Sequence, residues 1–302
     1  MKLKQLVLST LMIFGLYLIS CQKSIDSLIQ LPVYSNYLDK MYDVYDIGSG
    51  LDTQFISTIN YDNTKRVTSI IDSVLNGSNM EYYGSIVYSY NGSDTVPYKT
   101  DEKWKDVGGF GSADTTITFH FYDSQNKKTR DSSVKIHSNL SGTFYDKKII
   151  VVNYSYSTGK LFGQTILTPV FPVGGSIELY RDTADLNSAG DITMNKKYVF
   201  NGTDYDLKGI ANFTYDAFPN PFAKLSNFQS HREFPNGETL LLYECFSHTN
   251  RISQYEETYD NPNPPYIFSV SNTFTYNSDG YPVSATASGA YISTLYYKYK
   301  TL

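Results

Sequence analysis

The sequence lacks the features that mark disulfide scaffolds and nucleic-acid-binding proteins. Its 302 residues include two cysteines, Cys21 and Cys245, so a disulfide-rich scaffold is excluded. Charged residues make up 18% and hydrophobic residues 41% of the chain, a balance that excludes wholesale disorder. The lysines and arginines are scattered rather than gathered in a stripe, so nucleic acid is not expected as a partner.

Motifs that would indicate a particular chemistry are also missing. The chain has no Gly-x-Ser-x-Gly elbow, no P-loop and no His-Glu-x-x-His segment, and its four histidines show no metal-ligand spacing. Cys245 lies in an apolar segment and is expected to pack as a small apolar group, with a catalytic thiol as the alternative. We therefore predict no catalytic residues, no metal site, no cofactor and no enzymatic activity.

Tyrosine is the most unusual component that is present. The chain has 29 tyrosines, and tyrosine suits a half-buried pleated surface because it has an apolar ring and a polar hydroxyl. No long segment shows apolar residues at helical spacing, which disfavours parallel βαβ folds. Many segments alternate with period two instead. His120, for example, alternates with Phe119 and Phe121 and is expected on the opposite face of its strand.

The last segment of the chain, Phe274 to Lys300, is the clearest β-hairpin signal. An Asn277–Gly280 turn cluster separates two segments that alternate with period two. Weaker copies of this pattern recur along the chain. The fold class we predict is mostly β, with consecutive antiparallel hairpins forming one large twisted sheet or an open barrel or sandwich, and few short helices.

Four segments carry more specific expectations. We expect a longer loop at Thr100–Ala113 around Trp104, and a rigid turn at Tyr215–Phe222 because Pro219 and Pro221 cannot occupy central ladder positions. A short helical turn is predicted at Lys224–Ser230, and the most apolar strand at Glu238–Phe246.

The N-terminus has the three parts of a bacterial lipoprotein signal. Lys2 and Lys4 precede an apolar stretch from Leu6 to Ile19, which is too short for a comfortable transmembrane helix. Ser20-Cys21 then ends this stretch and resembles a lipobox. The resemblance implies cleavage between Ser20 and Cys21 and lipid attachment to Cys21, which would anchor the chain in the membrane. The alternatives are an ordinary signal peptide or an uncleaved anchor, with an incidental cysteine.

These observations divide the chain into three parts. Residues 1–20 are predicted to be the signal peptide, residues 21–50 the lipidated cysteine and tether, and residues 51–302 a β-rich domain of repeated hairpins. Within the tether range, Leu31–Ile47 could add a strand or a short helix to the domain.

A recurring unit pairs an apolar residue with Tyr-Asp or Tyr-Asn at the end of a strand. The tyrosine ring should pack, while the Asp or Asn side chain hydrogen-bonds the turn backbone. The copies are Ile59-Asn60-Tyr61-Asp62, Phe121-Tyr122-Asp123, Phe213-Thr214-Tyr215-Asp216 and Phe274-Thr275-Tyr276-Asn277.

The outline resembles the Tyr-Asp (YD) repeats of large secreted β proteins, although Gly280-Tyr281 stands where those repeats place Gly-Arg. The lipobox, Tyr215–Phe222 and Phe246–Asn250 together look like uncharacterised YD-rich lipoproteins of the Bacteroidota. That resemblance implies an antiparallel sheet of hairpins and a surface or periplasmic location, and it brings no activity with it.

The function predicted from these features is non-enzymatic binding by a lipid-anchored protein of the bacterial envelope, at the periplasmic or surface face of the outer membrane. The partner would be a glycan or an envelope protein that contacts a tyrosine-rich sheet. Aromatic rings suited to stacking on sugars are Trp104, Tyr296, Tyr297 and Tyr299, against the simpler interpretation of cross-strand packing. The alternatives are a glycan hydrolase with paired carboxylates and a structural or adhesin component that pairs through strand edges.

Overall fold

The computed structural model describes residues 36–46, 51–76, 79–106, 111–172, 175–221, 248–259, 264–290 and 293–302. Regular structure in these residues consists of β-strands, without a helix. The strands are β1 (Asn36–Asp46), β2 (Leu51–Tyr61), β3 (Val67–Asn76), β4 (Asn79–Ser89), β5 (Lys99–Asp106), β6 (Ser112–Tyr122), β7 (Lys128–Asn139), β8 (Phe144–Ser157), β9 (Lys160–Phe171), β10 (Glu178–Leu186), β11 (Ile192–Phe200), β12 (Tyr205–Pro219), β13 (Thr249–Thr258), β14 (Tyr266–Tyr276), β15 (Pro282–Gly289) and β16 (Ser293–Thr301).

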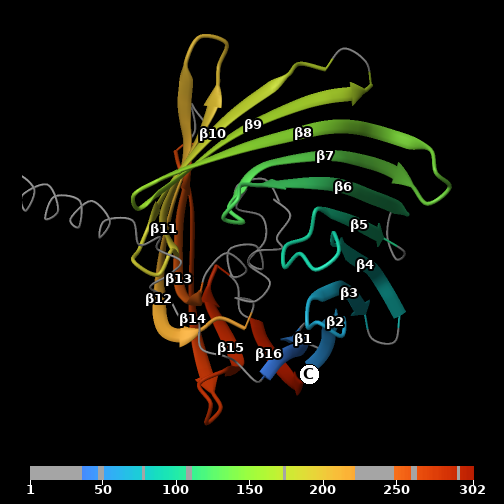
Figure 1. Cartoon of the computed structure of the whole chain (residues 1–302), viewed down its shortest axis with the longest axis vertical. Coiled ribbons are helices and arrows are strands. Elements are labelled where there is room, and N and C mark those ends of the chain that lie inside the picture. Colours follow the sequence, from blue (N-terminus) through green and yellow to red (C-terminus); the bar gives the residue numbers. More distant parts are fainter. Residues whose placement is uncertain are drawn as a thin grey trace, which may run out of the picture.

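The strands form one closed antiparallel barrel (Figure 1). Each strand pairs with its neighbours in the chain, and β1 closes the ring by pairing with β16, with Met41 opposite Tyr297. The prediction of a mostly β chain built from consecutive antiparallel hairpins is therefore confirmed. The predicted open sheet, open barrel or sandwich is wrong, because the sheet closes on itself. Closure pairs the edge strands of the hairpin series with each other, so the described strands leave no free edge.

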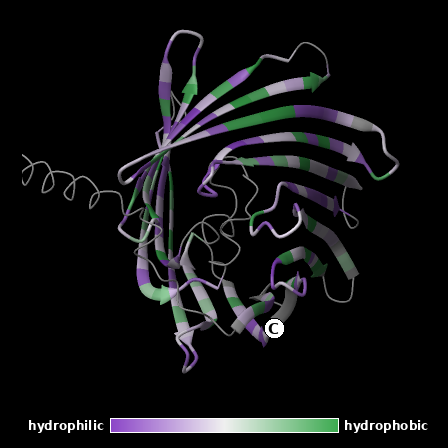
Figure 2. Ribbon diagram, in the orientation of Figure 1, coloured by the Kyte–Doolittle hydropathy of each residue, from purple (hydrophilic) through white to green (hydrophobic). Residues whose placement is uncertain are grey.

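Burial alternates along the strands and distinguishes the two faces of the barrel. In β6, Thr118 and His120 are buried, whereas Phe119 and Phe121 are 46% and 47% exposed. This agrees with the prediction that His120 lies opposite the two phenylalanines. A single sheet closed on itself has no second layer on its convex side, so the buried positions are the inward ones. Figure 2 shows the corresponding change between hydrophobic and hydrophilic residues along the strands.

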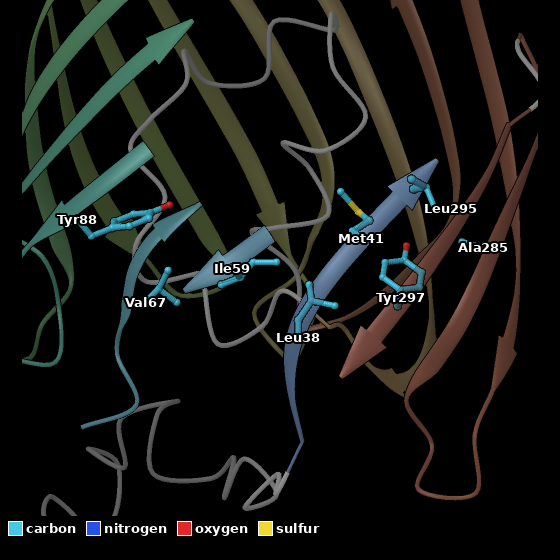
Figure 3. Close-up of a cluster of buried hydrophobic side chains, with 8 residues drawn as sticks. All are labelled: Leu38, Met41, Ile59, Val67, Tyr88, Ala285, Leu295 and Tyr297. Atoms are coloured by element: carbon cyan, nitrogen blue, oxygen red, sulfur yellow. The ribbon is translucent and has the colours of Figure 1, made fainter. Parts of the chain in front are cut away.

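The inward face includes apolar clusters. The largest joins β1–β4 to β15 and β16, and Figure 3 shows its side chains, which are Leu38, Met41, Ile59, Val67, Tyr88, Ala285, Leu295 and Tyr297. A second cluster lies on β10–β12 around Ala184 and Phe213, and a third on β8 and β9 around Val152. The apolar core is thus divided into sectors of the wall, with polar inward positions between them.

The predicted turn unit has a definite geometry. The Asp62 Oδ1 atom accepts hydrogen bonds from the backbone N–H groups of Thr64 and Arg66 at 2.8 and 3.0 Å. The fourth residue of this loop, Lys65, has a φ of 67°. This combination is a type I turn followed by a residue in the left-handed region, a common hairpin connection. The same loop recurs at Asp123, Asn139, Asn187 and Asn277, with Asn126, Gly142, Gly190 and Gly280 in the left-handed position.

Tyrosines at the strand ends fasten one end of the barrel. The Tyr215 hydroxyl donates to the Ile192 carbonyl at the start of β11, at 2.6 Å. Equivalent bonds join Tyr61 to Leu38, Tyr90 to Val67 and Tyr299 to Pro282. In every case, an even-numbered strand ends beside the start of the preceding odd-numbered strand. This is also the end at which β1 begins and β16 finishes.

Three local expectations have different outcomes. In the described part of the segment predicted as a loop around Trp104, residues up to Asp106 belong to β5 and residues from Ser112 belong to β6, so that prediction is wrong for these residues. The segment predicted as a rigid turn belongs to β12 as far as Pro219, so that prediction is wrong for Tyr215–Pro219. The β12–β13 register shifts between Thr214 and Tyr215 and again between Tyr215 and Pro219. Within the predicted tether, Asn36–Asp46 forms β1. The helical turn expected at Lys224–Ser230 and the strand expected at Glu238–Phe246 lie outside the described residues, as do Ser20, Cys21 and Cys245.

Candidate functional site

A buried polar network connects β5 to β8 on the inward face. Asp131 is fully buried, and its carboxylate lies 2.6 Å from His120 Nδ1, 2.8 Å from the Tyr154 hydroxyl and 3.3 Å from Lys128 Nζ. The other ring nitrogen of His120 lies 3.2 Å from the Thr100 hydroxyl. His120 and Asp131 are directly opposite each other in the β6–β7 register. Antiparallel pairing thus places these groups together without any contribution from a loop.

Burial shifts the pKa values of the groups in this network. Burial lowers the pKa of His120, although the hydrogen bond that His120 donates to Asp131 acts in the opposite direction. Burial also lowers the pKa of Lys128. Burial and the Asp131 charge together raise the pKa of Tyr154 well above its ordinary value. A neutral His120 can donate from Nδ1 to Asp131 and accept at Nε2 from Thr100.

The order hydroxyl, imidazole, carboxylate is also that of a nucleophilic triad. Here Thr100 is fully buried and His120 is 5% exposed, so a substrate has no route to the hydroxyl from the solvent around the barrel. Tyr154 and Lys128 occupy the other side of the carboxylate. The network is therefore suited to holding four strands in register rather than to nucleophilic catalysis.

Three further buried carboxylates, Asp72, Asp182 and Glu256, lie within hydrogen-bonding reach of side chains of the barrel wall. Asp72 accepts a hydrogen bond from the Ser57 hydroxyl, and Glu256 accepts one from the Gln254 amide. Asp182 lies 3.5 Å from the Asn195 amide nitrogen. Each of these carboxylates is less than 9% exposed, whereas paired catalytic carboxylates must contact a sugar. Among the described residues, no group of three or more His, Cys, Asp or Glu side chains is placed to hold a metal ion.

A second polar cluster surrounds Asp191 next to the left-handed Gly190. Asp191 is fully buried and accepts hydrogen bonds from the His248 backbone N–H and from the Thr249 hydroxyl, the latter at 2.6 Å. His248 Nδ1 lies 3.3 Å from the same carboxylate. Burial alone would raise the pKa of Asp191, but these donors outweigh it and lower the pKa. This cluster joins the β10–β11 loop to the start of β13.

The structure does not bring the four predicted aromatic residues together. Trp104 faces inward, and its ring lies over Gly84 so closely that an added Cβ there would be 2.3 Å from it. Tyr297 is 5% exposed in the largest apolar cluster, and the Tyr299 hydroxyl is used by the Pro282 carbonyl. Only Tyr296 faces outward, where it is 37% exposed and stacks on Tyr42 with ring centroids 5.2 Å apart.

The outward face differs strongly between sectors. On β5 the outward positions are all charged, namely Lys99, Asp101, Lys103 and Lys105, and Lys99 pairs with Asp101 at 2.8 Å. On β14 from Ser269 to Thr275 and on β15 from Ser284 to Ser288 they carry hydroxyls, and the Thr275 and Ser284 hydroxyls are 2.6 Å apart. Ile267, near the start of β14, is an outward apolar residue that is 58% exposed. On β6–β9 many of them are apolar. Sequence reasoning missed the charged sector on β5 because a strand with polar residues on both faces shows no hydrophobic alternation.

Comparison with known proteins finds solved structures with a similar fold. No family model and no curated protein sequence matches this chain. A solved porin-like protein from Bacteroides vulgatus aligns with a TM-score of 0.51 at 11% sequence identity, covering 88% of this chain and 100% of that one. A porin-like protein from Bacteroides uniformis aligns over 88% of this chain and 98% of its own, at 12% identity and a TM-score of 0.37. Among the described residues, no helix has the length and hydrophobicity needed to cross a membrane.

Proposed function

We propose that this chain is a non-enzymatic lipoprotein of the bacterial envelope whose barrel lies in water and serves as a binding scaffold. Its membrane attachment is the lipid on Cys21, at the periplasmic or surface face of the outer membrane. The barrel is tethered at the end where β1 begins, because Cys21 precedes Asn36 in the chain. The porin-like solved structure supports the barrel architecture, whereas the location and role rest on the residues of this chain.

The observation that carries this proposal is the charge and polarity of the outward face. A barrel that spans a membrane needs an apolar outward band about 25 Å tall around its whole circumference. Lys99 and Lys105 are separated by about 20 Å along β5, so they cannot both lie at one surface of a bilayer. Each lysine placed at the bilayer midplane costs about 2–4 kcal/mol. This cost is a large fraction of the total stability of a typical domain, about 5–15 kcal/mol.

The hydroxyl-bearing sector reinforces this argument. The outward positions of β14 from Ser269 to Thr275, and of β15 from Ser284 to Ser288, are serine and threonine throughout. Most of them are exposed. Hydroxyls on a convex sheet surface are readily solvated by water, whereas hydrocarbon offers them no hydrogen-bond partner. The outward face of this sector therefore favours an aqueous environment.

A protease site inserted into the tether tests this proposal. A recognition sequence placed after Gln30 in the full-length protein should allow cleavage to release a folded barrel from washed membranes at high salt or alkaline carbonate. Far-ultraviolet circular dichroism of the released fragment should show strand. A barrel that stays in the membrane pellet after complete cleavage and carbonate extraction would contradict the proposal. Loss of acyl labelling in Cys21→Ala separately tests the lipid attachment.

Tyr42 and Tyr296 are the outward aromatic pair that favours a glycan as one partner class. Their rings are 15° from parallel, and Lys298 Nζ lies 5.2 Å from the Tyr42 ring centroid. Glycan-array binding by the released barrel should fall in Tyr296→Ala and persist in Tyr255→Ala, a change on the outward face of β13. A blank array would instead direct attention to protein partners. The edge-pairing alternative loses its basis, because the described strands leave no free edge.

A further inference from the structure

The apolar sector of the outward face forms one continuous patch. We define the apolar outer patch as Ile117, Phe119, Val134, Ile149, Val151 and Ile166, which lie on β6–β9. One row of cross-strand neighbours runs from Ile117 through Val134 to Ile149. A second row runs from Phe119 through Ser132 and Val151 to Ile166.

The patch is in contact with the surrounding solvent. Phe119 is 46% and Ile149 is 37% exposed, although neighbouring side chains on a sheet surface shield one another. Cross-strand neighbours on one face lie about 4.5–5.5 Å apart at Cβ, so these residues touch laterally. An exposed apolar surface of this continuity marks an interaction site more often than isolated exposed residues do.

The rim of the patch is basic, although the chain as a whole is acidic with a formal net charge of −5. Lys160 and Asp185 form a 2.6 Å ion pair at one edge. The other charged outward positions of β5–β10 are basic apart from Asp101, and they are Lys99, Lys103, Lys105, Arg130, Lys147 and Arg181. Arg130 also lies over the Phe121 ring, with 5.7 Å between the guanidinium carbon and the ring centroid.

We propose that the apolar outer patch and its basic rim rest on the surface of an anionic lipid leaflet. Basic side chains are attracted to anionic headgroups, while the apolar side chains enter the boundary with the acyl chains. A second copy of the chain fits less well, because a symmetric contact would place the two basic rims against each other. The inference rests on the proposed function in one respect, namely that the tether keeps the barrel near a membrane.

The tether is long enough to allow this orientation. By strand order, β9 lies across the barrel from β1, as Figure 1 shows. A barrel of 16 strands is about 30 Å wide. The chain from Cys21 to Asn36 can extend to about 50 Å, so a lipid on Cys21 can insert in the leaflet that supports the opposite wall. The serine and threonine sector of β14 and β15 then faces water.

Two matched serine-to-cysteine changes test the contact in the full-length acylated protein. Ser132 lies within the patch between Phe119 and Val151, and Ser271 is an exposed outward residue of β14. Each is changed to Cys in a Cys245→Ser background and labelled with an environment-sensitive fluorophore. Vesicles that contain phosphatidylglycerol and a nitroxide lipid should quench the probe at position 132 several-fold more strongly than the probe at position 271.

The rim provides a second readout. Lys103→Glu with Lys105→Glu should reduce the quenching at position 132, and 1 M salt should do the same because the screening length falls to about 3 Å. Neutral phosphatidylcholine vesicles should also give weaker quenching. The circular dichroism spectrum of each variant establishes that the barrel is folded before its fluorescence is compared.

The outcomes separate the tether from the patch. Protein that floats with vesicles but shows equal quenching at both positions overturns the lipid contact and leaves the tether intact. Protein that does not float with the vesicles at all contradicts the tether and the lipid contact together. A probe at position 132 that is shielded without lipid, in proportion to protein concentration, identifies a second copy of the chain as the occupant and overturns the proposal.

Discussion

Five half-buried tyrosines with raised pKa values predict that this barrel unfolds near pH 11. Burial raises the pKa of Tyr61, Tyr122, Tyr154, Tyr215 and Tyr299 far above the ordinary value of 10.0. The unfolded chain therefore loses these protons first as pH rises through about 10, while the folded chain keeps them. Because the unfolded state then binds fewer protons, stability is complete below about pH 10 and is lost as the pH rises further.

The magnitude follows from linkage. For a tyrosine whose folded pKa is far above 10, ionisation of the unfolded state at about pH 11 costs about 1.4 kcal/mol of stability. Five such residues together cost about 7 kcal/mol, which is comparable to the total stability of a typical domain. Cooperative unfolding is therefore expected near pH 11, well below the pH at which the folded-state hydroxyls would ionise.

Parallel titrations followed by tyrosinate absorbance and by far-ultraviolet circular dichroism measure this effect. The two signals should change together in one transition for these five tyrosines. Tyr215→Phe removes one of these hydroxyls, so its free energy of unfolding should fall less between neutral pH and about pH 11 than that of the wild type. Tyr266→Phe, which alters a 67% exposed residue, should leave this fall unchanged. The reasoning is refuted if strand structure survives unchanged while all tyrosines titrate near pH 10.

Three further predictions concern individual contacts. Tyr215→Phe removes the hydroxyl that donates to the Ile192 carbonyl and should lower the free energy of unfolding by about 1–2 kcal/mol. Tyr296→Phe on the outward face should change it by less than about 0.5 kcal/mol. Urea denaturation measures both variants, and equal effects would contradict the role of the Tyr215 hydroxyl. Asp191→Asn should lower the free energy of unfolding by about 1.5–3 kcal/mol near neutral pH. Since the folded pKa of Asp191 is lowered, its stabilising contribution is present above about pH 4 and is lost as pH falls through the folded value. The difference in unfolding free energy from the wild type should therefore narrow in acid, and a constant difference would show that shape rather than charge matters. Gly280→Ala, at a φ of 80°, should lower the free energy of unfolding by about 1–2 kcal/mol. Asn126→Gly, at a φ of 59° in the equivalent loop, should leave stability unchanged or raise it. Thermal melts that show both variants equally destabilised would refute the left-handed assignment.

The local hairpin units were predictable because their signal is local. A tyrosine at a strand end followed by Asp or Asn has its turn partners two and four residues away, as Asp62 and Asn277 show. Barrel closure was not predictable in the same way. The pairing of Met41 with Tyr297 joins the two ends of the described chain, and nothing in either strand specifies a partner at that distance.

The inward polar network was also hidden from sequence analysis. His120 and Asp131 are opposite each other only after the β6–β7 register is fixed. The alternation of His120 with Phe119 did predict that the histidine and the phenylalanines lie on opposite faces. It could not show which face would be inward, because in a barrel with polar positions on both faces the phenylalanines can be the outward residues.

The prediction for β5 failed for a reason that bears on function. Inward Thr100, Glu102 and Trp104 alternate with outward lysines and one aspartate, so both faces of the strand are largely polar and the segment looks like a loop. A strand in a lipid-facing wall would have kept an apolar outward face and would have been recognised. The absence of alternation in β5 thus has the same physical origin as the proposed aqueous location of the barrel. The pairing of β5 with β6 also places the β5 lysines beside the apolar outer patch, where they supply positive charge for an anionic leaflet.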